Sequence, residues 1–249
     1  MLADSPSPNP QIAAEVDLAG PRRSAIRALV TRFFGRTGSS RKFTPDVFSK
    51  PEPYVLVEHG CQTRRTAERF IAQRFAEAFD AQIDAFMPRL FTVERPDGFV
   101  GGAFGLRSTR HRLFVEHYLD VSIEQAIAMR TGALVDRRSI VEIGHFSGAA
   151  PGAMRALILL LIERLHREGF AWVAFTGTTQ LRNAFRRMGL FPIDIAAATA
   201  ESIPAESLPA WGRYYDNAPR VLVGRICDGL PALTKALEAD VANAAGDFA

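Results

Sequence analysis

One stretch, residues 139–190, constrains the fold more than any other part of the chain. It opens with an apolar segment from Ile140 to Phe146, which a loop of small residues joins to an apolar helical segment from Gly152 to His166. The β-branched and aromatic residues at 171–175 predict a short strand, and a second helix is expected over 178–188. Because two strands separated by a helix favour parallel pairing with a right-handed crossover, the stretch predicts a mixed α/β fold.

The segments on either side add further strands and helices. Arg95-Pro96-Asp97-Gly98 has the residues of a tight turn and predicts a hairpin, and the pair Ser122 and Gln125 predicts a capping box at a helix start. The chain lacks the GxGxxG, GxxxxGK[ST] and GxSxG motifs, which argues against three large enzyme classes. The remaining strands are expected at 54–58, 90–94, 99–107, 112–118 and 191–195, and the remaining helices at 63–79 and 122–132.

Positive charge is concentrated near the N-terminus. The chain has 30 basic and 27 acidic residues, and seven of the basic ones lie in residues 22–42, which hold no acid. Three acids precede that segment, so residues 43–249 carry 23 basic and 24 acidic side chains. The body is therefore nearly neutral, and a nucleic-acid-binding surface is not indicated.

Composition divides the chain into three parts. Residues 1–50 are expected to be a flexible basic arm and linker, residues 51–235 one folded domain, and residues 236–249 a flexible tail. Within the arm, residues 22–35 have apolar side chains at helical spacing. They predict either an arm that packs on the domain or is partly disordered, or a basic amphipathic helix that contacts an acidic partner or the periphery of a membrane.

Several absences point to a reduced, cytoplasmic protein. No apolar run is long enough to span a bilayer, and the N-terminus has neither the basic start nor the apolar core of a secretory signal. The two cysteines, Cys61 and Cys227, do not make a disulfide framework. No cysteine or histidine spacing predicts a metal site.

The central stretch resembles the Gcn5-related N-acetyltransferase (GNAT) fold. Asn183-Ala184-Phe185 through Met188-Gly189-Leu190 is similar to the Asn-x-x-Phe…Leu-Gly-Phe end of a helix in that family. Glu142-Ile143-Gly144-His145-Phe146 is similar to the Glu-x-x-Arg-Phe strand of the acyl-homoserine-lactone (autoinducer) synthases, with His145 where arginine is usual. The same resemblance places Arg107, which closes the strand from Gly101 to Arg107, at the arginine of their Gly-x-x-Arg. These resemblances imply a GNAT-like mixed β-sheet flanked by helices.

Residues 54–225 as a whole resemble the thermostable hemolysin family, whose name records a lytic phenotype and no chemistry. The segments that carry this resemblance are EHGCQTRRTAERFIAQRFAEAF, GAFGLR, VEIGHFS, FTGTTQLRNAF and WGRYYDNAPRVLVG.

Three residues are candidates for catalysis: Glu142, His145 and Arg107. A carboxylate in an apolar strand costs several kcal/mol unless it is paired or hydrogen-bonded. Glu142 therefore either orients an attacking amine or takes its proton, directly or through water, or it forms a structural ion pair with Arg107 or another arginine. The catalytic role predicts that Glu142→Gln lowers turnover and leaves the melting temperature nearly unchanged. Strict alternation places His145 on the opposite face of the strand unless the strand bulges, as it does in GNAT folds. It is then either a base with a pKa near neutrality or a hydrogen-bonded core histidine.

Residues 147–154 lie where GNAT proteins bind pyrophosphate at a helix N-terminus. The usual glycine pair is degenerate here, which favours a donor held through its carrier protein; the alternative is an ordinary loop with Pro151 at the first helical position. The aromatic cluster after residue 210 either walls an acyl or acceptor pocket or belongs to a satellite core. The residues expected to bind substrate or acyl chain are Phe146, Ser147, Gly148, Gly152, Asn183, Trp211, Tyr214 and Tyr215.

The resemblance implies an N-acyltransferase. The acyl chain would come from a thioester of acyl carrier protein or coenzyme A and pass to the amine of an amino acid or related small molecule, with no tightly bound cofactor. In this hypothesis the basic segment 22–42 helps to dock the acidic carrier protein. Two alternatives stay open: a membrane-active, lipid-binding protein, and a binding protein that keeps the fold without the chemistry.

Overall fold

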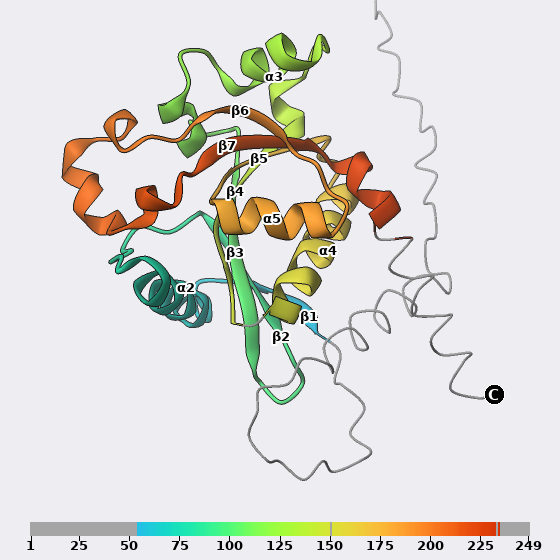
Figure 1. The fold of residues 1–249 in the computed structure, drawn as a ribbon. Coiled ribbons are helices and arrows are strands. Elements are labelled where there is room, and N and C mark those ends of the chain that lie inside the picture. Colours follow the sequence, from blue (N-terminus) through green and yellow to red (C-terminus); the bar gives the residue numbers. More distant parts are fainter. Residues whose placement is uncertain (1–53, 150, 233, 235–249) are drawn as a thin grey trace, which may run out of the picture.

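The computed structural model describes residues 54–149, 151–232 and 234. Its centre is a seven-stranded sheet in the order β1-β2-β3-β4-β5-β7-β6 (Figure 1). Among the described strand pairs, β4–β5 is parallel and the others are antiparallel. This mixed sheet with flanking helices confirms the predicted fold class. The predicted arm, its basic helix and the C-terminal tail lie outside the described residues.

The strands and α-helices follow one another much as the sequence predicts, and short 3-10 helices fill several of the connections. In chain order the elements are β1 (Val55–His59), α2 (Arg64–Phe79), β2 (Arg89–Glu94), β3 (Val100–Ser108), η1 (Phe114–Tyr118), α3 (Ile123–Thr131), η2 (Arg137–Ser139), β4 (Ile140–Gly148), α4 (Pro151–Arg167), β5 (Trp172–Gly177), α5 (Thr179–Arg187), β6 (Ile193–Ala197), η3 (Ala200–Ser202), η4 (Ala205–Trp211), η5 (Tyr214–Asn217) and β7 (Arg220–Arg225).

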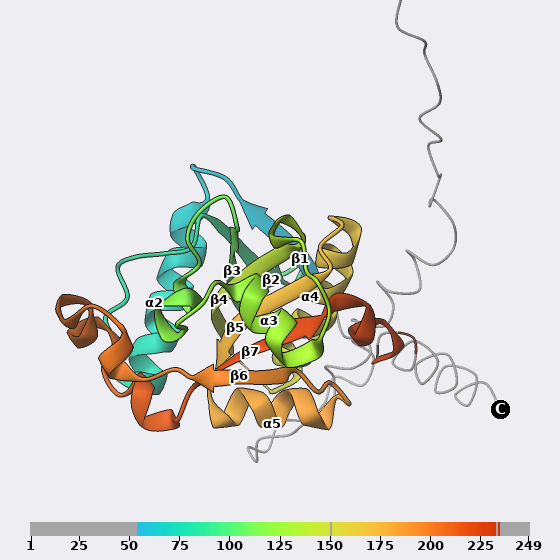
Figure 2. The same ribbon diagram turned by 90° about the horizontal axis from the view of Figure 1, so that it is seen from above.

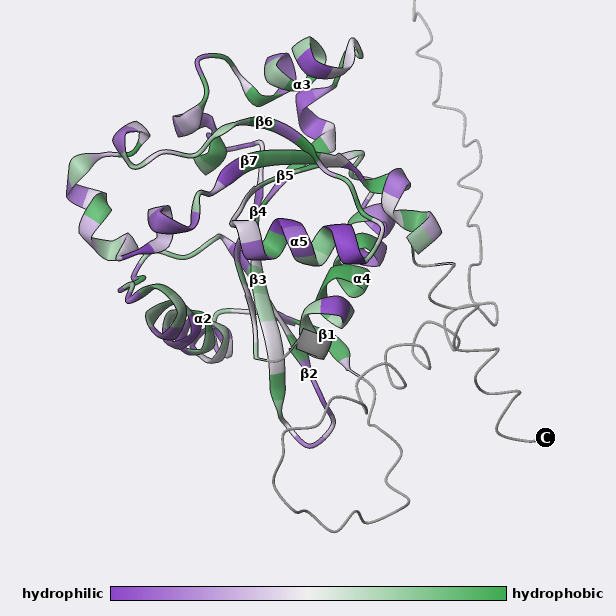
Figure 3. Cartoon of the chain, viewed as in Figure 1, coloured by the Kyte–Doolittle hydropathy of each residue, from purple (hydrophilic) through white to green (hydrophobic). Residues whose placement is uncertain are grey.

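Each face of the sheet is covered by its own set of helices (Figure 2). Val141 and Ile143 of β4 pack in one core cluster with Leu157 of α4, whereas Ile140 packs in another cluster with residues of η1 and α3. A third cluster joins α2 to the same face as η1. Hydrophobic residues run along α4 and β7, while α5 alternates between hydrophobic and hydrophilic ones (Figure 3). We call the two sides of the sheet the α4/α5 face and the α2 face.

Two local predictions are confirmed in detail. In the β2–β3 turn, the N–H of Gly98 donates to the carbonyl of Arg95 at 2.9 Å, which closes the predicted hairpin. At the start of α3, the N–H of Ser122 donates to the side chain of Gln125 at 3.2 Å. Gly132 ends that helix in the left-handed region, with φ of 72°.

The predicted strand at 112–118 is wrong, because residues 114–118 form the 3-10 helix η1. Its backbone N–H groups bond to two buried carboxylates instead of to a neighbouring strand. Glu116 accepts from the N–H of Leu113 at 3.0 Å, and Glu142 accepts from those of Phe114 and Val115 at 2.9 and 2.8 Å. The apolar residues that imitate a strand are buried against the α2 face.

Gly212 fixes the loop after η4 against the end of α2. The N–H of Arg213 donates to the carbonyl of Phe79 at 2.7 Å. Gly212 has φ of 51° and ψ of −124°, and an added Cβ would lie 2.4 Å from the carbonyl oxygens of Phe79 and Asp80. Such a conformation is nearly confined to glycine, and here the backbone contacts also exclude a side chain.

We expect Gly212→Ala to lower the free energy of unfolding by about 3 kcal/mol, as the sum of backbone strain and steric overlap. Gly132→Ala is the matched control. Gly132 also has a positive φ, but nothing lies within 4 Å of its added Cβ, so a loss of only about 1 kcal/mol is expected. Urea denaturation of both variants measures the difference, and equal losses would show that the contact with α2 is unimportant.

Candidate active site

The strands β4 and β5 separate within the sheet, and we call the unpaired stretch between them the slot. Their parallel pairing ends at Ile143 and Phe175, although β4 continues to Gly148 and β5 to Gly177. In the described ladder, the later part of β4 is therefore paired with β3 on one side and with no strand on the side facing β5. Buried peptide groups need hydrogen-bond partners, and the described β4–β5 ladder supplies none along this edge beyond Ile143.

A β-bulge lies beside the slot. The β3–β4 register shifts between Ala103 and Gly105, and His145 has φ of 56°. The extra residue turns the imidazole onto the α2 face, where it contacts the ring of Phe75 at 6.0 Å between centroids. Phe146 packs instead in the core cluster of the α4/α5 face. The bulge thus brings His145 to the same face of the sheet as Glu142.

Glu142 is a buried carboxylate held by the backbone of η1. The residue is 1% exposed, and its two oxygens accept the N–H groups of Phe114 and Val115. The guanidinium of Arg107, the cross-strand partner on β3, lies 3.7 Å from one of these oxygens. Burial raises the pKa of Glu142 to about 7, although the two backbone hydrogen bonds and Arg107 lower it. The group therefore exchanges a proton near neutral pH.

His145 has the opposite behaviour. Burial, together with the charge of Arg107, lowers the pKa of His145 to about 4, so the imidazole is neutral at pH 7. Within the described part of the chain, its buried Nδ1 has no hydrogen-bond partner. The pKa near neutrality that the sequence hypothesis gave to His145 is found at Glu142.

The predicted aromatic cluster of Trp211, Tyr214 and Tyr215 lies on the α2 face. Tyr214 is buried against Phe75 of α2, and its hydroxyl donates to Oγ1 of Thr176 at 3.0 Å. Thr176 belongs to the part of β5 that has left β4, so this hydrogen bond ties the cluster to one wall of the slot. Burial raises the pKa of Tyr214 to about 12, which keeps its hydroxyl protonated.

The hydroxyls of Tyr118 and Tyr215 lie 2.8 Å apart, so η1 and the aromatic loop are joined above the sheet. Burial also raises the pKa of Tyr118. Trp211 contacts the ring of Phe114, whose N–H donates to Glu142, at 5.6 Å between centroids. The carboxylate and the aromatic cluster therefore share one neighbourhood on the α2 face.

The other predicted substrate residues are spread around the slot. The hydroxyl of Ser147 donates to the carbonyl of His145 at 2.7 Å, which stabilises the bulge. Gly148 pairs with β3 at the end of β4, Gly152 lies in the first turn of α4, and Asn183 is exposed on α5. Gly152 and Asn183 belong to α4 and α5, which cover the α4/α5 face, whereas the aromatic cluster lies on the α2 face.

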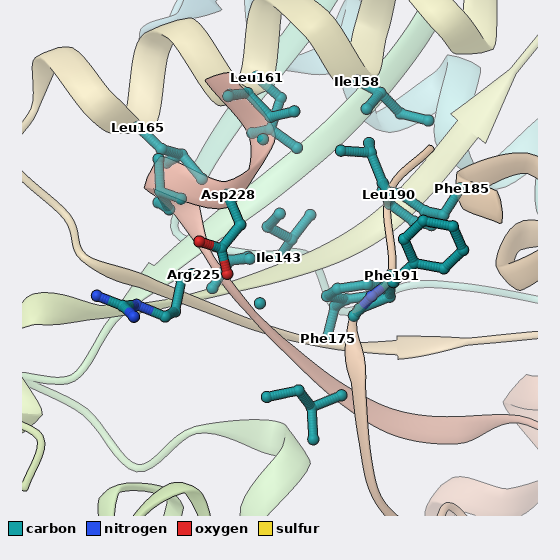
Figure 4. A pocket seen from close by; sticks show the side chains of 17 residues that line it. Ile143, Ile158, Leu161, Leu165, Phe175, Phe185, Leu190, Phe191, Arg225 and Asp228 are labelled. Atoms are coloured by element: carbon teal, nitrogen blue, oxygen red, sulfur yellow. The ribbon is translucent and has the colours of Figure 1, made fainter. Parts of the chain in front are cut away.

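An apolar pocket lies on the α4/α5 face, with an empty volume of about 700 Å³ including its open mouth (Figure 4). It begins at Ile143 and Phe175, the last paired residues before the slot. Arg225 and Asp228, both exposed, are the charged residues of its lining. The apolar walls come from α4, α5, β5 and the segments around β6 and β7: Ile158, Leu161, Ile162, Leu165, Val173, Phe185, Leu190, Phe191, Pro192, Ile193 and Ile226.

Comparison with known protein families assigns this chain to one of them. The thermostable hemolysin family matches residues 57–230, most of the described part. The chain belongs to the thermostable hemolysin family. This confirms the family resemblance seen in the sequence. A comparison with curated proteins gave no sequence match.

This hemolysin-family chain was also compared with solved structures. TofI in its apo form is 14% identical, with a TM-score of 0.50 over 72% of this chain and 96% of that one, and the two proteins share a fold. The CoA-dependent acyl-homoserine lactone synthase MesI is 16% identical, with a TM-score of 0.47 over 75% and 95% of the two chains. FeeM, an N-acyl amino acid synthase from uncultured soil microbes, is 13% identical, with a TM-score of 0.45 over 70% and 92%.

Sequence reasoning missed several site features of this hemolysin-family protein. The η1 donors to Glu142 were hidden by the strand-like pattern, and only their position just after Arg112 and before a capped helix marks a connecting segment. The apolar pocket has no signal of its own, because its lining follows the same periodicity as a packed core. No sequence pattern at Thr176 or Tyr118 predicts the hydrogen bonds that join these residues to the aromatic loop.

In the described residues, no group of three histidine, cysteine, aspartate or glutamate side chains could hold a metal ion. None of the helices in residues 54–149 and 151–232 has the length and apolar character needed to cross a bilayer.

Proposed function

We propose that this protein is an N-acyltransferase, which moves an acyl chain from a thioester to the amine of a small molecule. The observation that carries the proposal is Glu142. This carboxyl group is buried beside the slot between β4 and β5, shares a face with the aromatic cluster, and has a pKa raised to about 7. A purely structural carboxylate is more stable when its partners lower its pKa, whereas a general base for neutral pH needs a value near 7.

In the proposed reaction, the amine nitrogen attacks the thioester carbonyl carbon, the carbon–sulfur bond breaks, and the sulfur leaves as a thiolate. The amine must lose a proton, which Glu142 accepts directly or through water. Each oxygen of Glu142 accepts one backbone N–H and keeps a further lone pair for this step. Arg107, one quarter exposed and 3.7 Å from Glu142, offers a positive charge to the carboxylate of an amino-acid acceptor.

The slot and the apolar pocket supply the other parts of the site. N–H groups on the edge of β4 beyond Ile143 stabilise the negative oxygen that forms on the thioester carbon. The pocket starts at Ile143 and Phe175 and receives the acyl chain. The aromatic cluster closes the acceptor side, because Tyr214 is tied to Thr176 on the wall of the slot.

The donor carries its acyl chain on acyl carrier protein or coenzyme A. The proposal that the donor is acyl carrier protein depends on residues 22–42, which lie outside the described part of the chain. The proposed membrane contact of residues 22–35 lies outside it as well. Deleting residues 1–42 tests the docking role, since a docking arm would raise KM for the carrier-bound donor at low salt and leave kcat nearly unchanged.

The direct test is an incubation of the purified protein with acyl-coenzyme A or acyl carrier protein and a mixture of amino acids. Mass spectrometry detects the amide, and a thiol reagent detects the released carrier. Amide formation by the native protein and its loss in Glu142→Ala support the proposal. Lysis of lipid vesicles by the native protein, with no amide from either donor, contradicts it and favours the membrane-active alternative.

The raised pKa of Glu142 leads to a second prediction, which concerns the pH dependence of turnover. Only the ionised carboxylate accepts a proton, so kcat should rise with pH and level off above an inflection near 7. Turnover measured from pH 5 to 9 with one acyl donor checks this, and the residual activity of Glu142→Gln should lack the inflection. The pKa of His145, about 4, lies too low to account for an inflection near 7. An identical inflection in the glutamine variant would assign the proton to another group.

A further inference from the structure

Gly224 is an unusual residue for its position in the sheet. It lies within β7, whose residues Val221, Leu222 and Val223 are buried, and it lines the apolar pocket. Glycine in the interior of a strand weakens it and often marks the close approach of a ligand. A β-branched side chain would suit the strand better.

Neither backbone conformation nor packing requires a glycine there. Gly224 has no positive φ, and an added Cβ would meet only Cγ1 of Val173, at 3.6 Å, which is an ordinary contact. Gly229, the other glycine in the lining, differs, because its added Cβ would lie 2.9 Å from the side chain of Ile162. The missing side chain of Gly224 therefore leaves open space in the pocket.

The position along the sheet shows which part of a bound chain would use that space. Gly224 pairs with Val173 and Leu222 pairs with Phe175, the residue at the slot. The two pairs lie two residue steps apart along the strands, a distance of roughly 7 Å. On this geometry a short acyl chain that enters from the slot would end before Gly224, whereas a longer one would lie directly on the backbone of β7.

We propose that Gly224 sets the length of the acyl chain that this protein accepts, and that its substrates are long fatty-acyl thioesters. The proposal rests on the acyl-transfer function and names the substrate class for it. Gly224 touches the distal part of the chain and takes no part in the chemistry at the thioester.

The test compares chain-length profiles of kcat/KM for acyl-coenzyme A donors in native protein, Gly224→Ala and Gly224→Val. We expect Gly224→Val to lower kcat/KM about tenfold or more for chains of roughly twelve carbons, with less than about a twofold change for chains of roughly four. Gly224→Ala should shift the profile in the same direction by a smaller amount. It also serves if the valine variant fails to fold, since its Cβ fits the space.

Gly60→Ala is the matched control, because Gly60 lies outside the pocket and nothing is within 4 Å of its added Cβ. Its profile should match that of the native protein. An equal loss at every chain length in the two Gly224 variants would overturn the proposal.

Failure of the acyl-transfer function can be told apart by a binding measurement. Saturated fatty acids of increasing length displace 1-anilinonaphthalene-8-sulfonate from the pocket, and fluorescence reports the displacement without turnover. If native protein transfers no acyl chain but Gly224→Val weakens only the long fatty acids, the pocket inference stands and the function does not. Unchanged affinity at all lengths in Gly224→Val overturns the inference itself.

Discussion

Replacing Glu142 by glutamine is expected to reduce acyl transfer by about two to four orders of magnitude, the usual contribution of a positioned general base. Glutamine has nearly the same shape, but it cannot accept the proton that the attacking amine releases. The change should appear mainly in kcat, because the acyl pocket and the aromatic cluster are left in place. Steady-state rates with a saturating acyl donor measure it.

The same substitution should also destabilise the protein, in contrast to the nearly unchanged melting temperature that the sequence predicts. The two oxygens of Glu142 accept the N–H groups of Phe114 and Val115, and glutamine offers an oxygen to only one of them. One buried N–H is left facing an amide NH₂, which costs about 1 to 3 kcal/mol. Rates must therefore be compared per folded molecule, with the folded fraction taken from circular dichroism at the assay temperature.

Glu116→Gln is the matched control for the rate. Glu116 also accepts a backbone N–H at η1, but its hydrogen-bond partners in the described structure are Leu113, Ile123 and Arg137. Its folded fraction should retain kcat within about twofold. Equal rate losses in the two variants would mean that Glu142 acts only by holding η1 in place.

The central β-loop-α-β-α order could be predicted because each of its elements has a strong local signal. The apolar strand, the capped or glycine-ended helices and the tight turns are all specified by nearby residues. The conformation of segment 112–118 could not be predicted, because its apolar residues fit a strand as well as they fit a buried 3-10 helix. Its conformation is decided by Glu116 and Glu142, and the second of these lies 24 residues beyond the segment.

The site was predictable at the level of residues and not of geometry. Glu142 stands out as a lone acid in an apolar strand, but its pKa depends on how far it is buried and on which N–H groups reach it. The side of the sheet that His145 occupies depends on a bulge, and no residue near His145 predicts that bulge. The pocket is formed by space that is left unfilled, as at Gly224, and sequence alone does not record the packing around a glycine.

Glu116→Gln is expected to cost about 3 to 5 kcal/mol of stability at pH 7, the range for breaking a buried ion pair on one side. The Glu116 side chain is 8% exposed, and the guanidinium of Arg137 donates to both of its oxygens at 2.6 and 3.0 Å. The same carboxylate accepts the N–H groups of Leu113 and Ile123, so it joins the start of η1 to the start of α3. Removing its charge leaves the guanidinium only Glu124 as a carboxylate partner in the described structure.

The pH dependence of stability should separate the two glutamates. Burial raises the pKa of Glu116, but the hydrogen bonds from Arg137, Ile123 and Leu113 outweigh it and lower the value to about 2. The stability it contributes is therefore present above its ordinary pKa of about 4.5 and is lost as pH falls toward 2. The pKa of Glu142 is raised to about 7, so its contribution is largest below pH 4.5 and is lost as pH rises through 7.

Urea denaturation from pH 2 to 8 measures both effects as the difference in unfolding free energy between native protein and each glutamine variant. For Glu116→Gln the difference should grow as pH rises from 2 to 4.5, and for Glu142→Gln it should shrink as pH rises from 4.5 to 7. Slopes of the same sign would show that both carboxylates are ionised anchors of η1, and a base at Glu142 would then be excluded. Opposite slopes would mean that one of the two buried acids, Glu142, has a pKa near neutral pH, which is the property that a general base for acyl transfer to an amine needs.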